Sequence, residues 1–243
     1  MSANIKFINR GTKTGEIWLY DTVGEGFFGG MSAKQFADEL KGLGAVDTIN
    51  LRINSPGGNV FDGVAIYNQL QRHPAQIVVD VDGLAASIAS VIAMAGDEIR
   101  IAENAMMMIH NPEGFSMGDA GEMRKTADLL DHIKGTIVDT YGRRTKADVG
   151  DISKWMADET WFSAGDAVAN GFADSTTAEQ PIAACYGFDL TQFRNAPPTM
   201  LARATGYPAR DMRAVRLRNQ EIRVRTLYSG DKQNPAPLNG GFF

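Results

Sequence analysis

Residues 83–90 have the sequence Gly83-Leu84-Ala85-Ala86-Ser87-Ile88-Ala89-Ser90. The β-branched run before them, residues 76–82, predicts a buried strand that closes at the glycine. The small and apolar residues from Ser87 to Ala95 predict a short buried helix. A serine in the first turn of a helix lies beside N–H groups that can bind an oxyanion. Tight core packing of a small-residue helix would explain the same residues, so this segment alone leaves its role open.

Two further motifs flank this segment. The first, Ile53-Asn54-Ser55-Pro56-Gly57-Gly58, follows a predicted strand and ends in glycines that let the backbone approach a ligand. The second, Met108-Ile109-His110-Asn111-Pro112, places a histidine where a short strand leaves the core. A structural turn and a structural histidine would be the ordinary explanation for either motif taken separately. The occurrence of the three motifs in this order favours a catalytic interpretation.

In this order the motifs resemble the proteolytic subunit of the Clp protease. Members of that family carry an I-N-S-P-G-G turn, a G-x-A-A-S nucleophile segment and an M-I-H-x-P histidine. The resemblance continues through residues 159–164 and 167–174, so it covers roughly the first three quarters of the chain. It implies an α/β fold, a ClpP/crotonase-like spiral of β-β-α units with a protruding handle helix, followed here by an irregular C-terminal extension. Alternating strands and helices in the sequence favour the same class.

The resemblance also implies roles for individual residues. Ser87 would be the nucleophile and His110 the general base. The backbone amides of Gly58 and Ile88 would form the oxyanion hole, in which each donor matters because losing one costs on the order of a hundredfold in rate.

The acidic member of the site is where the sequence departs from the family. The family carries an aspartate shortly before an aromatic-x-Ser-Ala segment, and the register puts Glu159 at that position. Glutamate serves in some hydrolases of this type, although it is one methylene longer. Asp158 is the alternative if the backbone shifts by one residue. A third possibility is a Ser–His dyad in which neither carboxylate points inward.

Composition restricts the class of protein. The chain of 243 residues is 44% hydrophobic with a net charge of -5, which suits a globular protein and gives no reason to expect nucleic-acid or membrane affinity for the whole chain. Its single cysteine, Cys185, cannot form an internal disulfide, which favours a reducing compartment. With no signal-peptide pattern and no membrane-spanning run, a cytoplasmic location is predicted. No metal cluster and no phosphate-binding G-x-x-x-x-G-K-[ST] motif is present in the sequence, so no cofactor is predicted.

Helical patterns occur on both sides of the motifs. Ser32 and Gln35 have capping-box spacing and predict a helix through Leu40, and residues 61–72 predict another. Residues 116–141 predict a long amphipathic helix, which in the Clp family would be the handle through which two rings dock. A further helix is predicted over residues 146–157.

The last quarter of the chain has a different composition. We divide the sequence into a protease domain, residues 1–180, and a basic, partly disordered extension, residues 181–243. Seven arginines lie between Arg203 and Arg225. The extension is either a solvated tail or an adaptor for an acidic protein surface or nucleic acid. The Glu-Thr-Trp segment at residues 159–161 also resembles phage-encoded Clp-like proteases associated with capsid maturation, in which case the extension would bind capsid or scaffold protein.

The predicted function is that of a serine endopeptidase acting on peptides or unfolded protein. The resemblance implies a homo-oligomeric ring, a heptamer or double ring, that encloses a chamber and works with an AAA+ unfoldase, which would bind the ATP. Two alternatives stay open. One is a non-catalytic ring or scaffold subunit of the same fold, and the other is a crotonase-type enzyme acting on acyl-CoA thioesters.

Overall fold

The computed structural model describes residues 5–9, 13–25, 30–179 and 188–205 of the chain, and its central feature is one sheet. The eight strands of the described residues are β1 (Ile5–Asn9), β2 (Thr14–Leu19), β3 (Thr48–Ser55), β4 (Gln76–Ala86), β5 (Glu98–Ala102), β6 (Met106–Ile109), β7 (Thr160–Ser163) and β8 (Ser175–Thr177). The main path through the sheet is β1-β2-β3-β4-β5-β8. Strand β1 is antiparallel to β2, whereas all later neighbours on this path are parallel.

Strand β4 divides the sheet. Its first half, residues 78–81, pairs with β5, and its last residues, 84–86, pair in parallel with β6. Strand β6 in turn pairs antiparallel with β7. On this side β4 pairs first with β5 and then, near its C-terminal end, with β6. The end of β4 that leads to Ser87 therefore lies beside β6 and β7 rather than beside β5.

The cross-strand register separates an apolar row from a charged row. Ile17, Leu51, Val79 and Ile99 lie opposite one another on β2 to β5, and all four are fully buried. The adjacent positions, Trp18, Arg52, Asp80 and Arg100, form the next row. Since successive side chains of a strand point to opposite faces, the apolar row supplies the core and the charged row lies on the other face.

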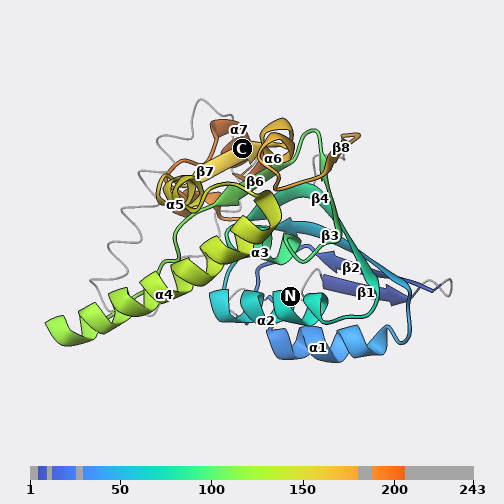
Figure 1. Ribbon diagram of the computed structural model, residues 1–243, viewed down its shortest axis with the longest axis horizontal. Coiled ribbons are helices and arrows are strands. Elements are labelled where there is room, and N and C mark those ends of the chain that lie inside the picture. The colour runs from blue at the N-terminus through green and yellow to red at the C-terminus, as the bar shows by residue number, and fades with distance from the viewer. Residues whose placement is uncertain (1–4, 10–12, 26–29, 180–187, 206–243) are drawn as a thin grey trace, which may run out of the picture.

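Helices account for the remaining secondary structure: α1 (Ala33–Gly42), α2 (Val60–Gln71), α3 (Ile88–Ala93), α4 (Ala120–Thr145), α5 (Val149–Ala157), α6 (Ala164–Ala169), the short 3₁₀-helix η2 (Leu190–Gln192) and α7 (Pro198–Thr205). Helices α1 and α2 lie side by side along one face of the sheet, with α3 between α2 and the strands (Figure 1). The predicted capping box of α1 is confirmed, since Ser32 and Gln35 hydrogen-bond reciprocally. The mixed α/β fold predicted from the sequence is confirmed.

Helix α4 is the handle expected from the resemblance, and it projects from the body of the molecule (Figure 1). Its predicted start at Ser116 was wrong. Asp119 is the N-cap, accepting hydrogen bonds from the amides of Gly121 and Glu122, so the helix begins at Ala120. At the other end α4 continues past the predicted Tyr141 to Thr145, where the left-handed conformation of Lys146 ends it. Helix α5 therefore begins at Val149, later than the predicted residue 146.

Two other predicted boundaries were wrong near the nucleophile motif. Gly83 does not end the strand, because β4 continues to Ala86, the residue before the serine. The following helix, α3, is shorter than predicted and ends at Ala93, with Met94 as its C-cap. Ser87 is therefore the single residue between strand and helix.

None of the helices in the described ranges combines the length and apolar character that crossing a membrane requires. The single cysteine and the arginine-rich stretch after Thr205 lie outside the described residues.

Candidate active site

Strand register brings the three predicted site residues to one edge of the sheet. Ala86 at the end of β4 lies opposite Met108 on β6, and the Ser87 amide donates to the Met108 carbonyl over 2.9 Å. Parallel strands end at the same edge, so the residues that follow β4 and β6, Ser87 and His110, leave the sheet together. Ile109 lies opposite Thr160 on the antiparallel β7, which brings Glu159 to the same edge.

Ser87 is held in a conformation that few non-glycine residues adopt. Its φ is 55° and its ψ is -130°, and it serves as the N-cap of α3. The Ser87 carbonyl accepts a 2.6 Å hydrogen bond from the hydroxyl of Ser90, which lies 2.8 Å from the hydroxyl of Tyr141 on α4. A positive φ costs about 1–3 kcal/mol and persists only where the surroundings impose it. Here the strand, the helix and α4 all fix the serine backbone.

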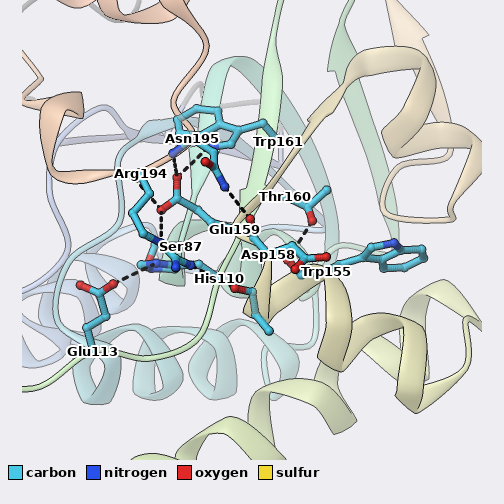
Figure 2. Close-up of polar contacts among 11 residues, drawn as sticks. Ser87, His110, Glu113, Trp155, Asp158, Glu159, Thr160, Trp161, Arg194 and Asn195 are labelled. Carbon is cyan, nitrogen blue, oxygen red and sulfur yellow. Dashed lines mark hydrogen bonds and ion pairs between the residues drawn. The ribbon is translucent and has the colours of Figure 1, made fainter. Parts of the chain in front are cut away.

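The serine hydroxyl and the histidine ring are in direct contact. Ser87 Oγ lies 2.8 Å from His110 Nε2 (Figure 2), a distance at which the hydroxyl can donate to the neutral ring. The amide of Asn111 donates to the Met156 carbonyl and fixes the chain just after the histidine. Burial lowers the pKa of His110, while the carboxylates of Glu113 and Glu159 act in the opposite direction and Arg194 lowers it further. A neutral imidazole beside a hydroxyl can accept its proton.

The glycine turn at residues 57–58 lies against the serine. Gly57 has a φ of 91°, and a Cβ on it would approach the Ser87 Cβ and the Ala86 carbonyl oxygen to 2.7 Å and the Ile88 amide to 3.2 Å. On either side of Gly58 the main chain is bonded to Val23, which accepts from the Asn59 amide and donates to the Gly57 carbonyl. The backbone around Gly58 is thereby fixed beside the start of α3.

Glu159 lies behind this pair and is buried, with 3% of its surface exposed. Its φ of 51° is again in the left-handed region. Its carboxylate accepts hydrogen bonds from the amides of Arg194 (2.8 Å) and Asn195 (2.7 Å) and from the indole of Trp161 (3.2 Å) (Figure 2). Within the described part of the chain, no hydrogen bond joins this carboxylate to His110, so its effect on the ring is electrostatic.

Asp158, the alternative acid, is not brought to the site. Its side chain is 54% exposed and pairs with Lys154 one turn earlier on α5. Glu113, in contrast, lies close to the imidazole: its Oε1 is 4.0 Å from His110 Nδ1 (Figure 2).

Sequence reasoning missed Glu113, Phe193, Arg194 and Asn195. The spacing His-x-x-Glu was the available signal for Glu113. For the other three, the apolar residues Leu190, Phe193 and Ala196 at spacings of three indicated a packed segment, but the resemblance ends before them.

Comparison with known proteins relates the chain to one family of proteases. The model of the Clp protease family matches residues 5–180. The ATP-dependent Clp protease proteolytic subunit 1 of Leifsonia xyli subsp. xyli is 33% identical over 163 residues, which cover 65% of this chain and 80% of that protein. Subunit 2 of Thermobifida fusca is 33% identical over 154 residues, covering 61% and 76%. The corresponding subunit of Spinacia oleracea is 36% identical over 132 residues, covering 53% and 67%.

The α/β fold holds a serine and a histidine in contact at the ends of its strands, which is the pairing that a serine-type peptidase, a hydrolase, requires. The chain belongs to the Clp protease family. It is accordingly a serine endopeptidase of the kind that acts within an oligomeric chamber, and the family assignment favours this interpretation over the acyl-CoA alternative.

Proposed function

We propose that Ser87, His110 and Glu159 are the nucleophile, the general base and the acidic residue of this endopeptidase. The observation that supports this most directly is the 2.8 Å contact between Ser87 Oγ and His110 Nε2. In the first half of the reaction, Ser87 Oγ attacks the scissile carbonyl carbon and His110 Nε2 takes the hydroxyl proton. His110 then protonates the leaving amine, and the peptide bond breaks to leave an acyl-serine.

In the second half, water attacks the acyl-serine and gives its proton to His110, which returns it to Ser87 as the acid leaves. Each half passes through a tetrahedral oxyanion, and we assign the amides of Gly58 and Ile88 as its donors. Their support is the fixed backbone around Gly58 and the position of Ile88 as the first residue of α3, next to the nucleophile.

We assign Glu159 to the stabilisation of the imidazolium that forms in both halves. The support is its burial behind the ring and its effect of raising the pKa of His110. The Asp158 side chain is exposed and pairs with Lys154 at the surface, away from the imidazole, which argues against this role. A dyad remains the alternative, because the carboxylate acts without a hydrogen bond to the ring among the described residues.

For the assembly, we propose a ring of identical subunits that receives unfolded chains, in a cytoplasmic setting. The support is family membership, and the names of the relatives describe those proteins as ATP-dependent. A role in processing phage capsid proteins is a further proposal that rests only on the Glu-Thr-Trp segment and the basic extension. Co-purification with an unfoldase or with a capsid protein would separate these two settings.

The experiment that tests the peptidase site compares wild type, Ser87→Ala and Ser32→Ala on a fluorogenic peptide, with a serine-directed phosphonate as a label. Ser87→Ala is expected to lower kcat/KM at least about a thousandfold and to abolish labelling. Ser32 caps α1 and makes no hydrogen bond to Ser87 or His110 among the described residues, so its variant should retain both. Equal hydrolysis by wild type and Ser87→Ala would refute the proposal.

A further inference from the structure

The described part of the C-terminal extension folds back onto the site. Residues 188–205 follow the region matched by the Clp family, which ends at residue 180. The apolar side chains of the segment pack against Leu84 and Ala86 of β4 and Met108 of β6, the strands that lead to Ser87 and His110. These side chains are buried: Leu190, Phe193, Ala196, Met200 and Leu201. The segment therefore belongs to the core around the site.

Its main chain supplies hydrogen bonds to Glu159. The amide of Arg194 donates to Oε2 and the amide of Asn195 to Oε1, so each carboxylate oxygen has a main-chain donor from this segment. The glutamate side chain is only 2% exposed, and a buried carboxylate without donors carries a large desolvation cost. Trp161 is the one hydrogen-bond donor to this carboxylate from the family-matched region among the described residues.

Two side-chain bonds tie the same segment to the end of α5. The amide nitrogen of Asn195, Nδ2, donates to the Asp158 carbonyl over 2.7 Å, and Arg194 Nη2 donates to the Ala157 carbonyl over 3.0 Å. These bonds fix the backbone immediately before Glu159. The Glu159 carboxylate is thus held in two ways, by the fixed backbone before it and by the hydrogen bonds that it accepts (Figure 2).

Phe193 contacts the histidine. Its ring meets His110 edge-on, with centroids 5.7 Å apart and an angle of 78°, and meets Trp161 in the same manner at 5.7 Å. An edge-to-face contact restricts ring orientation and excludes water from one side of the imidazole. One tripeptide, Phe193-Arg194-Asn195, therefore touches both the base and the acid of the proposed site.

We propose that Phe193, Arg194 and Asn195 are positioning residues that hold His110 and Glu159 in their working arrangement, so that this chain completes its active site with a segment outside the family-matched region. The proposal rests on the proposed function, since it assigns work to residues that act through His110 and Glu159. A segment that only covered apolar surface would need neither the paired amides on one carboxylate nor a contact with the imidazole.

The first test separates the main-chain amide of residue 194 from its side chain. In the full-length chain, Arg194→Pro removes the N–H, whereas Arg194→Ala removes the guanidinium and keeps the N–H. We expect kcat/KM of Arg194→Pro to be about a hundredfold below that of Arg194→Ala, the loss typical of a misplaced catalytic group. Oligomeric mass and circular dichroism are to be measured first, to establish that both variants fold. Equal kcat/KM in the two folded variants would overturn the proposal.

The second test uses the pH dependence of kcat/KM and decides the matter if Arg194→Pro does not fold. Among the described residues, the charged groups that act on His110 are Glu113, Glu159 and Arg194, and the Ser87 hydroxyl contacts its Nε2. In Phe193→Ala, water reaches the imidazole and the pKa of His110 rises, so the acidic limb of the profile moves to higher pH. Phe193→Leu, which keeps the site covered, should restore the wild-type limb. A limb that does not move in Phe193→Ala would refute the positioning role.

The two proposals fail in different ways. If wild type and Ser87→Ala hydrolyse the peptide equally, the assignment of the site is wrong. If Ser87→Ala is inactive but the Arg194 and Phe193 pairs show no difference, only the positioning role is wrong.

Discussion

Two residues of the site, Ser87 and Glu159, have φ values of 55° and 51°, although neither is a glycine. Strained residues of this kind concentrate at functional sites, where the surrounding structure imposes them. At Ser87 the strain turns the hydroxyl out of the strand and toward the imidazole. At Glu159 it turns the chain from the end of α5 into β7, so that the side chain points inward while that of Asp158 stays in solvent.

Replacing Glu159 by glutamine tests its electrostatic role. The glutamate charge raises the pKa of His110, so its removal lowers that pKa. The neutral base then persists to lower pH, and the acidic limb of kcat/KM is expected to move to lower pH. The glutamine NH₂ also opposes a main-chain N–H of residue 194 or 195. Together these changes should lower kcat/KM on the order of a thousandfold, measured on the fluorogenic peptide across the pH range.

Asp158→Asn is the matched control for this prediction. The Asp158 side chain is exposed and, within the described ranges, pairs with the surface residue Lys154, so its variant should keep the wild-type rate and pH profile. If Asp158→Asn loses activity while Glu159→Gln keeps it, the register of the acidic residue is wrong. Full activity in both variants would favour the Ser–His dyad.

Gly57→Ala addresses the turn that borders the nucleophile. A Cβ there would lie 2.7 Å from the Ser87 Cβ, and the φ of 91° disfavours any side chain. We expect kcat/KM to fall at least about a hundredfold, because the turn and the serine must move apart. Gly44→Ala is a fair comparison, since that glycine also has a positive φ of 70° but a Cβ would meet nothing within 4 Å. A similar loss in both variants would mean that backbone strain, rather than contact with Ser87, is responsible.

At the scale of elements, the sequence predicted which segments form strands and helices better than where they end. Periodicity located β3, β4 and α2, because their apolar side chains line the core. It misplaced the start of α4, where Gly118 and the cap Asp119 decide the boundary rather than the amphipathic stripe. It also ended β4 at Gly83, although pairing with β6 carries that strand on to Ala86. Such ends depend on tertiary partners that periodicity does not contain.

Helices α2 and α3 pack closely at a glycine of α2. A Cβ on Gly63 of α2 would lie 2.1 Å from Cγ1 of Ile88, the first residue of α3. Because Ile88 is buried, Gly63→Ala should destabilise the fold by about 1–3 kcal/mol and, by shifting Ile88, lower kcat/KM as well. Thermal unfolding and peptide hydrolysis measure the two effects.

Gly135→Ala in α4 is the matched control. This glycine lies inside a helix and a Cβ there would meet nothing within 4 Å, so alanine should stabilise the protein by about 0.5–1 kcal/mol with unchanged activity. If Gly63→Ala also raised the unfolding temperature, the close contact between α2 and α3 would be wrong.

In the folded molecule, the three ordered motifs predicted that Ser87 and His110 lie together, but they did not predict which residues surround Glu159. Ser87 and His110 are 23 residues apart, and family resemblance was enough to pair them. The two main-chain donors to Glu159 come from 35 and 36 residues further along the chain, beyond the family-matched region. No local pattern links an amide to a carboxylate at that separation, so only the folded structure relates the extension to the site.

The exposed surface near the start of the handle predicts how subunits assemble. Met117 is 86% exposed just before α4, and Met123 on its first turns is 52% exposed. Large apolar side chains gathered on a projecting element favour contact with another protein surface.

If two rings dock through the handles, Met117→Asp combined with Met123→Asp should halve the assembly mass in native mass spectrometry, because the introduced carboxylates repel one another across the contact. Val149→Asp is the control, since Val149 is 61% exposed but lies at the start of α5, and its assembly mass should be unchanged. An unaltered mass in the double variant would show that the handle does not join the rings.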